Sequence, residues 1–243
     1  MYIDKRMIYV LIALMVVSGL SRYLSDTNAL LGLLYTIPGL LVAITFHEFA
    51  HAFAADKLGD DTPRRQGRLT LNPLSHLDPI GSVMLLFAGF GWGKPVEVNP
   101  RNYDRRMSMD KADAIVSIAG PLMNFFIALV LTLIYCAMYK FLGIKILGSQ
   151  VLQIIMAIIY YAISINIGLG VFNLIPVPPL DGSKIIKSIL PYNARTWFEN
   201  NERIFEIIFV ALWIFGILSM IITPVIQLVF SGVMNLGVMI FGI

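Results

Sequence analysis

The sequence predicts an all-α polytopic membrane protein with about five to six transmembrane helices and a small membrane-associated β-hairpin or re-entrant segment. Of its 243 residues, 58% are hydrophobic and only 14% are charged. A soluble domain of this size carries about 25% charged residues. Apolar runs long enough to cross a bilayer recur along the chain, and the basic residues are divided unevenly between the polar segments that separate them. These observations exclude an ordinary soluble globular protein.

The apolar runs define the expected membrane helices. The first apolar run, Met7 to Leu20, comes directly after Lys5 and Arg6, as the apolar part of a secretory signal does. No small-residue cleavage site stands out after it, so we expect a helix that is retained in the mature protein. We expect residues 1–243 to form a single integral-membrane domain. The spans are expected at about 7–21, 29–55, 112–138, 151–175 and 204–222, and the sequence leaves open whether a further apolar segment at about 224–242 also crosses.

The polar stretch between the second and third spans contains the expected departures from helix. The run IGSVMLLFAGFGW at 80–92 is apolar over 13 residues, too short to cross, and fits a re-entrant or interfacial segment. The following GKPVEVNPRNY alternates around Val96 and Val98, as a short edge strand does, and Asn99-Pro100 closes it. Together these stretches predict the hairpin or re-entrant element.

The basic residues predict the orientation in the membrane. Of the 18 Lys and Arg residues, only Arg22, Lys140 and Lys145 fall on one side of the predicted membrane, which leaves 15 on the other. Cytoplasmic loops carry an excess of Lys and Arg, so we expect a multi-pass protein of the cell membrane whose N-terminus faces the cytosol. The net charge of +3 therefore reports topology, and no nucleic-acid partner is expected.

The stretch HEFAH at 47–51 places ionisable side chains inside a run that otherwise has the composition of a membrane helix. Such groups are expensive at that depth and indicate a functional site. Positions i and i+4 share one helix face, so His47 and His51 can bind one metal ion together. Glu48 is rotated by roughly 100° from His47, so its carboxylate can reach water at the metal without being a ligand. The alternative is a pair of neutral imidazoles that hydrogen-bond within the helix bundle.

A third metal ligand is required, because a catalytic zinc site usually has three protein ligands and one open position. Asp181 in NLIPVPPLDG is the better candidate, since the fourth span ends on the cytosolic side, where His47 and His51 also lie. The alternative for Asp181 is a plain Leu-Asp-Gly turn. The remaining histidine, His76 in SHLDP, is expected to shape its loop.

HEFAH in one span, followed more than a hundred residues later by NLIPVPPLDG at the end of another, resembles the site-2 protease family of intramembrane zinc metalloproteases. The resemblance covers about residues 29–190. GPLMN at 120–124 is similar to the family's Gly-Pro-x-x-Asn element, and GWGKPVEVNPRN at 91–102 is similar to its membrane-associated strand segment. The chain resembles the compact form of the family, without the PDZ or CBS domain that some members carry.

The resemblance implies a zinc metalloendopeptidase that hydrolyses peptide bonds in or near transmembrane segments of membrane proteins, within the lipid bilayer. It implies Zn²⁺ held by His47, His51 and Asp181. Glu48 would be the general base, taking a proton from water and delivering it to the leaving amine.

Two asparagines also match the family motifs. Asn173 matches an asparagine that supports the substrate or the oxyanion, and an Asn amide is a suitable neutral donor for that charge. Its alternative role is an interhelical hydrogen bond, which is common in membranes. Asn124 matches the last residue of the GPLMN element, and its role is open at this stage.

Two other classes of function are compatible with the same residues. An ion-binding transporter or channel would also carry His, Glu and Asp inside the membrane, although here these groups gather at one depth near the cytosol. A catalytically inactive scaffold would retain the fold, but the intact Glu48 argues against it. The sequence leaves the substrate, the scissile bond and the oligomeric state open.

Overall fold

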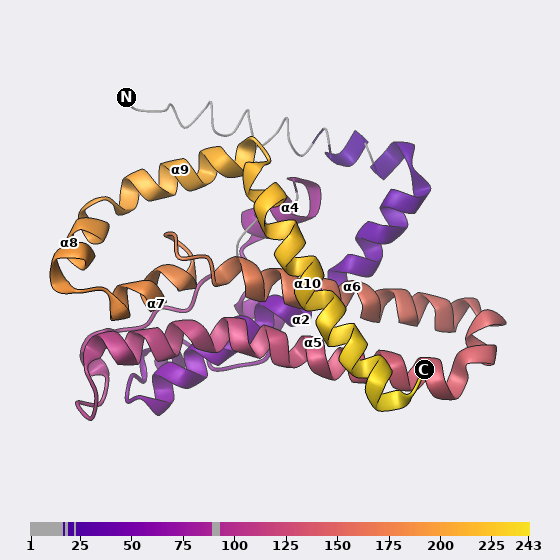
Figure 1. Ribbon diagram of the computed structural model, residues 1–243, viewed down its shortest axis with the longest axis horizontal. Coiled ribbons are helices and arrows are strands. Elements are labelled where there is room, and N and C mark those ends of the chain that lie inside the picture. The colour runs from indigo at the N-terminus through magenta and orange to yellow at the C-terminus, as the bar shows by residue number, and fades with distance from the viewer. Residues whose placement is uncertain (1–16, 18, 22, 89–92) are drawn as a thin grey trace.

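The regular structure of the chain is helical (Figure 1). The computed structural model describes residues 17, 19–21, 23–88 and 93–243. Its α-helices are α2 (Thr27–Lys57), α3 (Thr62–Arg65), α4 (Pro79–Ala88), α5 (Met109–Leu147), α6 (Gln150–Asn173), α7 (Asp181–Ile189), α8 (Tyr192–Asn200), α9 (Glu202–Ile214) and α10 (Ile217–Phe241), and two short 3₁₀ helices, η1 (Pro73–Ser75) and η2 (Pro100–Asn102), lie in the loops.

Four helices in the described part of the chain are long and apolar enough to cross a membrane, namely α2, α5, α6 and α10. The first three correspond to the spans expected at 29–55, 112–138 and 151–175. The expected span at 7–21 lies almost entirely outside the described residues. A multi-pass membrane protein is therefore confirmed, whereas the count of five to six spans is not.

The expected boundaries at the C-terminal end are wrong. The span predicted at 204–222 is interrupted where α9 ends at Ile214, and Gly216 adopts a left-handed φ of 71° before α10 begins. With 13 residues, α9 is shorter than the roughly 20 residues that a membrane crossing requires. The segment expected at 224–242 is part of α10, because Pro224 is accommodated inside that helix.

The expected β-hairpin is also not formed in the described residues. They contain a single isolated antiparallel bridge, between Leu77 and Gly93, and no strand. The first part of the predicted re-entrant run is the helix α4, and residues 89–92 lie outside the described part. The segment 94–99 has no regular structure. Its backbone bonds to the side chains of Glu48, Asp60 and Arg68 and to the backbone carbonyl of His76, and not to a partner strand.

Asp60 fixes the far end of this segment. Its carboxylate is fully buried and accepts hydrogen bonds from the backbone N–H of Asn99 at 2.6 Å, from Asn102 Nδ2 at 2.9 Å and from Thr62. Burial alone would raise the pKa of Asp60, but these donors hold the pKa below its usual range. The loop after α2 and the segment 94–99 are thereby joined.

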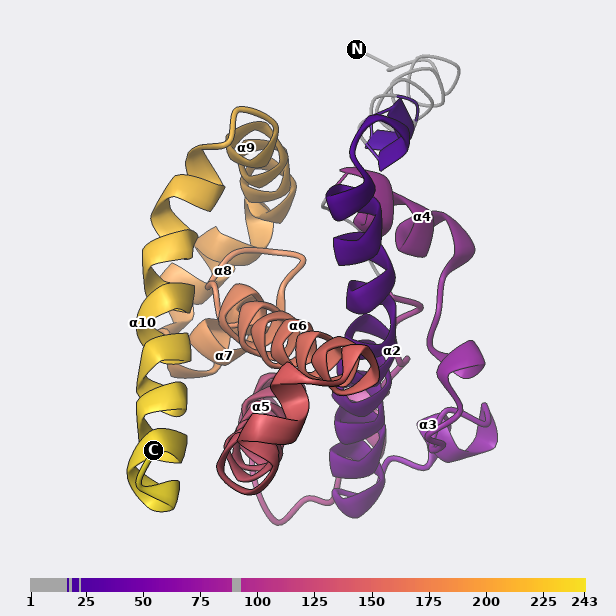
Figure 2. The same ribbon diagram turned by 90° about the vertical axis from the view of Figure 1, so that its right-hand side faces the viewer.

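Close packing of three helices forms the centre of the molecule. Figure 2 shows α5 and α6 side by side, with α2 against one side of the pair and α10 against the other. Gly39 of α2 meets Ala162 of α6 so closely that a Cβ atom at position 39 would lie 2.6 Å from the Ala162 Cα. Helices approach this closely in membranes where small residues line the contact.

We therefore expect Gly39→Ala to destabilise the protein. The added methyl group would force α2 away from the backbone of α6, and overpacking of this kind costs about 1–3 kcal/mol. Gly168→Ala in α6 is the matched control, because a Cβ there would meet only Ile226 Cδ1, at 3.9 Å. Thermal unfolding in detergent should show a lower midpoint for Gly39→Ala alone, and equal midpoints would contradict the close contact.

Candidate metal centre and active site

Two histidines on one face of α2 form the base of the site. His47 and His51 are one helical turn apart, and their Nε2 atoms lie 3.0 Å from each other. Both are buried, with 5% and 9% of their surface exposed. The pairing follows from the helical period, because residues i and i+4 project from the same face.

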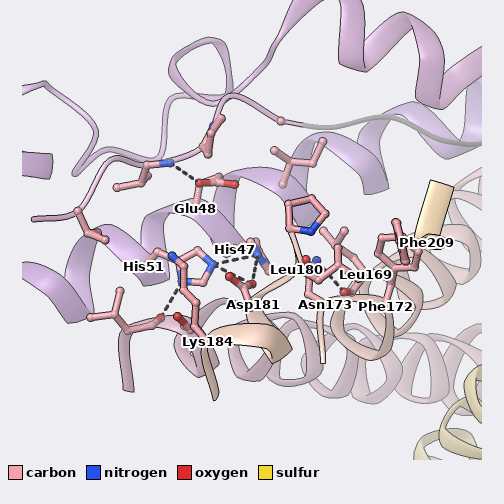
Figure 3. A pocket seen from close by; sticks show the side chains of 18 of the residues that line it. His47, Glu48, His51, Leu169, Phe172, Asn173, Leu180, Asp181, Lys184 and Phe209 are labelled. Carbon is pink, nitrogen blue, oxygen red and sulfur yellow. Dashed lines mark hydrogen bonds and ion pairs between the residues drawn. The ribbon is translucent and has the colours of Figure 1, made fainter. Parts of the chain in front are cut away.

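Asp181 joins the two histidines from the start of α7. Its Oδ2 atom lies 3.2 Å from Nε2 of His47 and 3.2 Å from Nε2 of His51. Asp181 is the first residue of α7, and the N-terminus of this helix favours the ionised carboxylate. The structure thus brings together the three residues that the sequence singled out as ligands (Figure 3).

A chain of hydrogen bonds across three helices fixes the tautomer of His47. Asn124 of α5 donates through Nδ2 to the carbonyl of Ala43 at 3.0 Å and to Oδ1 of Asn166 at 3.1 Å. Its Oδ1 therefore faces His47 Nδ1, at 2.6 Å. Because an amide oxygen only accepts, the proton of His47 resides on Nδ1 and the Nε2 lone pair points into the site. This gives Asn124 the role that the sequence left open.

The tautomer of His51 is fixed in the same sense. Its Nδ1 lies 2.7 Å from the backbone carbonyl of Val116, which also only accepts. The lone pairs of both Nε2 atoms consequently converge with Oδ2 of Asp181, which is buried and has no hydrogen-bond donor in the described chain. Two imidazole nitrogens and one carboxylate oxygen without a shared proton suit a cation such as Zn²⁺.

Two glycines create the space for this arrangement. A Cβ on Gly120 of α5 would lie 2.4 Å from Nε2 of His51 and 2.7 Å from Cε1 of His47. A Cβ on Gly182 would lie 2.4 Å from the backbone oxygens of Leu174 and Ile175. Gly182 is therefore required by close approach of α7 to the end of α6, and the plain turn considered for Leu-Asp-Gly does not form, because Asp181 begins a helix.

A pocket of about 620 Å³ opens beside the three ligands. Glu48 lines it from α2, and one oxygen of its carboxylate, Oε2, accepts the backbone N–H of Val96 at 2.8 Å. Asn173 also lines the pocket and donates one amide hydrogen to the carbonyl of Leu169 at 3.0 Å. Figure 3 shows Glu48 and Asn173 on different sides of the group formed by the two histidines and Asp181.

His76 does not take part in this group. It is fully buried, and its Nε2 lies 2.8 Å from the backbone carbonyl of Thr70. Its own backbone carbonyl accepts the N–H of Lys94 at 2.8 Å. These contacts agree with the loop-shaping role expected from the sequence.

Sequence reasoning missed several residues that contribute to the site. The backbone groups of Val116 and Val96 have no sequence signal, because any residue carries a carbonyl and nearly any residue carries an N–H. Gly120 was noticed only as part of a motif. Asn166 could have been found, since it is a polar residue in an otherwise apolar span and such residues mark interhelical hydrogen bonds.

Comparison with known proteins supports this assignment of chemistry. The profile of peptidase family M50 matches residues 35–216. YwhC of Bacillus subtilis is 36% identical over 207 residues, which cover 85% of this chain and 92% of YwhC. Rip2 of Mycobacterium tuberculosis is 31% identical over 150 residues, and the match spans 60% of this chain but only 53% of Rip2.

A more distant relative is the zinc metalloprotease MJ0392 of Methanocaldococcus jannaschii. It is 28% identical over 184 residues, which are 74% of this chain and 42% of that protein. YwhC and Rip2 are likewise assigned by name as zinc metalloproteases. No solved structure matches this chain.

We expect Gly120→Ala to abolish metal binding while the helices remain folded. The new methyl group would occupy the space of the His51 ring, so the two Nε2 atoms could no longer meet Asp181. Metal content of the purified protein, measured by elemental analysis, should fall to background. Gly168→Ala again serves as the control and should retain the metal, and full metal content in Gly120→Ala would contradict the packing described.

Proposed function

This chain belongs to peptidase family M50, and we propose that it is an intramembrane zinc metalloendopeptidase that cleaves membrane proteins in or near their transmembrane segments. The observation that carries the proposal is the meeting of His47, His51 and Asp181 at the wall of a pocket that Glu48 also lines. The ion transporter considered from the sequence is not favoured, because these groups gather in one pocket. An inactive scaffold is not favoured either, because the ligand set and Glu48 are intact.

The two Nε2 atoms and the Asp181 carboxylate would hold Zn²⁺. Three protein ligands leave a position open for the reaction, as in other catalytic zinc sites. When bound, zinc supplies Lewis acidity, polarising a carbonyl and lowering the pKa of water to about 7. The hydrogen bonds to Nδ1 of His47 and His51 would orient both rings and increase the basicity of the ligand nitrogens.

Glu48 would act as the general base. Its Oε2 is held by the N–H of Val96, whereas Oε1 accepts no hydrogen bond within the described chain and is free to receive a proton. A carboxylate in this position takes the proton from the attacking water and delivers it to the leaving amine. Removal of an acid–base group of this kind slows a reaction by about 10²–10⁴-fold.

Asn173 would donate a hydrogen bond to the developing oxyanion. Its amide carries two hydrogens, of which one bonds to Leu169, so the second remains for a substrate oxygen in the pocket. Neutral donors aimed at such a charge lower the barrier of acyl transfer. The competing role is purely structural, since the bond to Leu169 lies within α6 itself.

The substrates would be transmembrane proteins, approached from the cytosolic half of the bilayer. A transmembrane helix hides its amides in internal hydrogen bonds and must be unwound before a peptide bond can be attacked. The segment 94–99 borders the pocket, and the backbone of Glu97 and Val98 forms no hydrogen bonds within the described chain. An unwound substrate could pair with it by β-augmentation. Its alternative role is to anchor the loop.

Zinc content tests the ligand assignment. We expect about one zinc per chain in the wild-type protein, and its loss in His47→Ala and Asp181→Ala, because each removes one of three ligands. His76→Ala should retain zinc, since this ring lies against Thr70 and not in the ligand group. Elemental analysis of detergent-purified protein gives the measurement, and full zinc retention in Asp181→Ala would remove that residue from the site.

Glu48→Gln tests the base. This variant should bind zinc and unfold at the wild-type temperature, because the ligands are unchanged, yet cleave a single-span model substrate at least about a hundredfold more slowly. Cleavage is followed by gel electrophoresis of the reconstituted reaction. An unchanged rate would exclude water activation by Glu48.

A further inference from the structure

The chain just before Val96 is held from two sides. The backbone N–H of Lys94 donates to the carbonyl of His76 at 2.8 Å. Arg68 donates through Nη2 to the carbonyls of both Lys94 and Pro95, the second at 2.9 Å. Proline fixes its own φ near −65°, so the backbone from 94 to 96 has little remaining freedom.

Arg68 is an unusual arginine in this loop. It is 5% exposed, forms no ion pair with a carboxylate in the described chain, and leaves Nη1 buried without a partner. Its neighbours Arg64 and Arg65 are exposed and pair with Asp56 and Asp61. A buried cation is costly when it is not paired. Solubility therefore does not explain why Arg68 is buried and bonded to two backbone carbonyls.

The reason lies in the geometry of a single peptide group. The carbonyl of Pro95 and the N–H of Val96 belong to the same planar unit and, in a trans peptide, point in opposite directions. Arg68 binds the carbonyl on one side, and the N–H on the other side donates to Oε2 of Glu48 at 2.8 Å. Fixing the carbonyl fixes the direction of the N–H. The charge of Arg68 also polarises this peptide and strengthens its N–H as a donor.

We propose that Arg68 is a positioning residue for Glu48, acting through the Pro95–Val96 peptide to hold one carboxylate oxygen so that the other faces the pocket. A glutamate side chain has several rotatable bonds, and misplacement of a reacting group by about 1 Å can cost a hundredfold in rate. Arg68 does not line the pocket, so its effect reaches the reaction only through this peptide. The inference rests on the proposed role of Glu48 as the base.

The test compares Arg68→Met with Arg64→Met in the full chain loaded with zinc. Each change removes one positive charge from the region after α2. Only Arg68→Met removes the hydrogen bonds to the carbonyls of Lys94 and Pro95. With a quenched-fluorescent single-span peptide as substrate, Arg68→Met should lower kcat by roughly tenfold to a hundredfold, with KM and zinc content unchanged. Arg64→Met should match the wild type. Arg68→Lys, which keeps the charge and one donor nitrogen, should recover part of kcat.

A wild-type kcat in Arg68→Met overturns the proposal, and so does a loss of activity accompanied by an equal loss of zinc. If Arg68→Met fails to fold, Val96→Pro decides. This change removes the N–H that reaches Glu48. Its zinc content should equal that of the wild type while its kcat falls by at least about tenfold, and a wild-type kcat in Val96→Pro overturns the proposal.

Glu48→Gln is assayed in parallel, so that failure of the role proposed for Arg68 can be distinguished from failure of the proposed function. If the zinc-loaded wild-type protein does not cleave the peptide, the proposed function fails. If Glu48→Gln cleaves it at the wild-type rate, the role of Glu48 as the base fails, and the inference about Arg68 fails with it. If Glu48→Gln is slowed at least about a hundredfold while Arg68→Met is fully active, the proposed function stands and only the role of Arg68 is lost.

Discussion

Close approach of α5 to α2 at Gly120 is the constraint on which the site depends. With any side chain at this position, the imidazoles of His47 and His51 would have no room. The same approach brings Asn124 and the carbonyl of Val116 within hydrogen-bond distance of the two Nδ1 atoms. Packing and chemistry are therefore linked, because the contact that joins the helices also sets the protonation of the rings.

The polar groups of the site are arranged so that few of them are left unsatisfied in an apolar surrounding. Asn166 and Asn124 connect α6, α5 and α2 in one chain of hydrogen bonds that ends at His47. Such groups would be expensive in the membrane if they were isolated. The ligand atoms are the exception: Oδ2 of Asp181 is buried without a donor beside two imidazole lone pairs, which is the arrangement that a cation requires.

The loop after α2 and the segment 94–99 form a second support for the pocket. Asp60, Arg68 and His76 bond to the backbone of this segment at different points along its length. The side chains of Asp60 and Arg68 and the backbone carbonyl of His76 therefore occupy part of the polar backbone that a partner strand would otherwise bond to. This explains why alternation around Val96 and Val98 did not lead to a strand: Pro95 has no N–H, and the N–H of Val96 is taken by Glu48.

The sequence alone determined the membrane class, three of the long helices, and the residues that meet at the site. In a bilayer, the backbone N–H and C=O groups of a long apolar run are hydrogen-bonded within a helix. The i, i+4 spacing of His47 and His51 places both residues on one helix face whatever else surrounds them. The break between α9 and α10 was not determined, because the apolar composition is continuous and only the left-handed turn at Gly216 interrupts it. Tertiary structure alone decided the tautomers of the histidines, the need for Gly120 and Gly182, and the contact between Val96 and Glu48. These depend on backbone groups and close approaches between segments far apart in the chain, which leave no periodic pattern in the sequence.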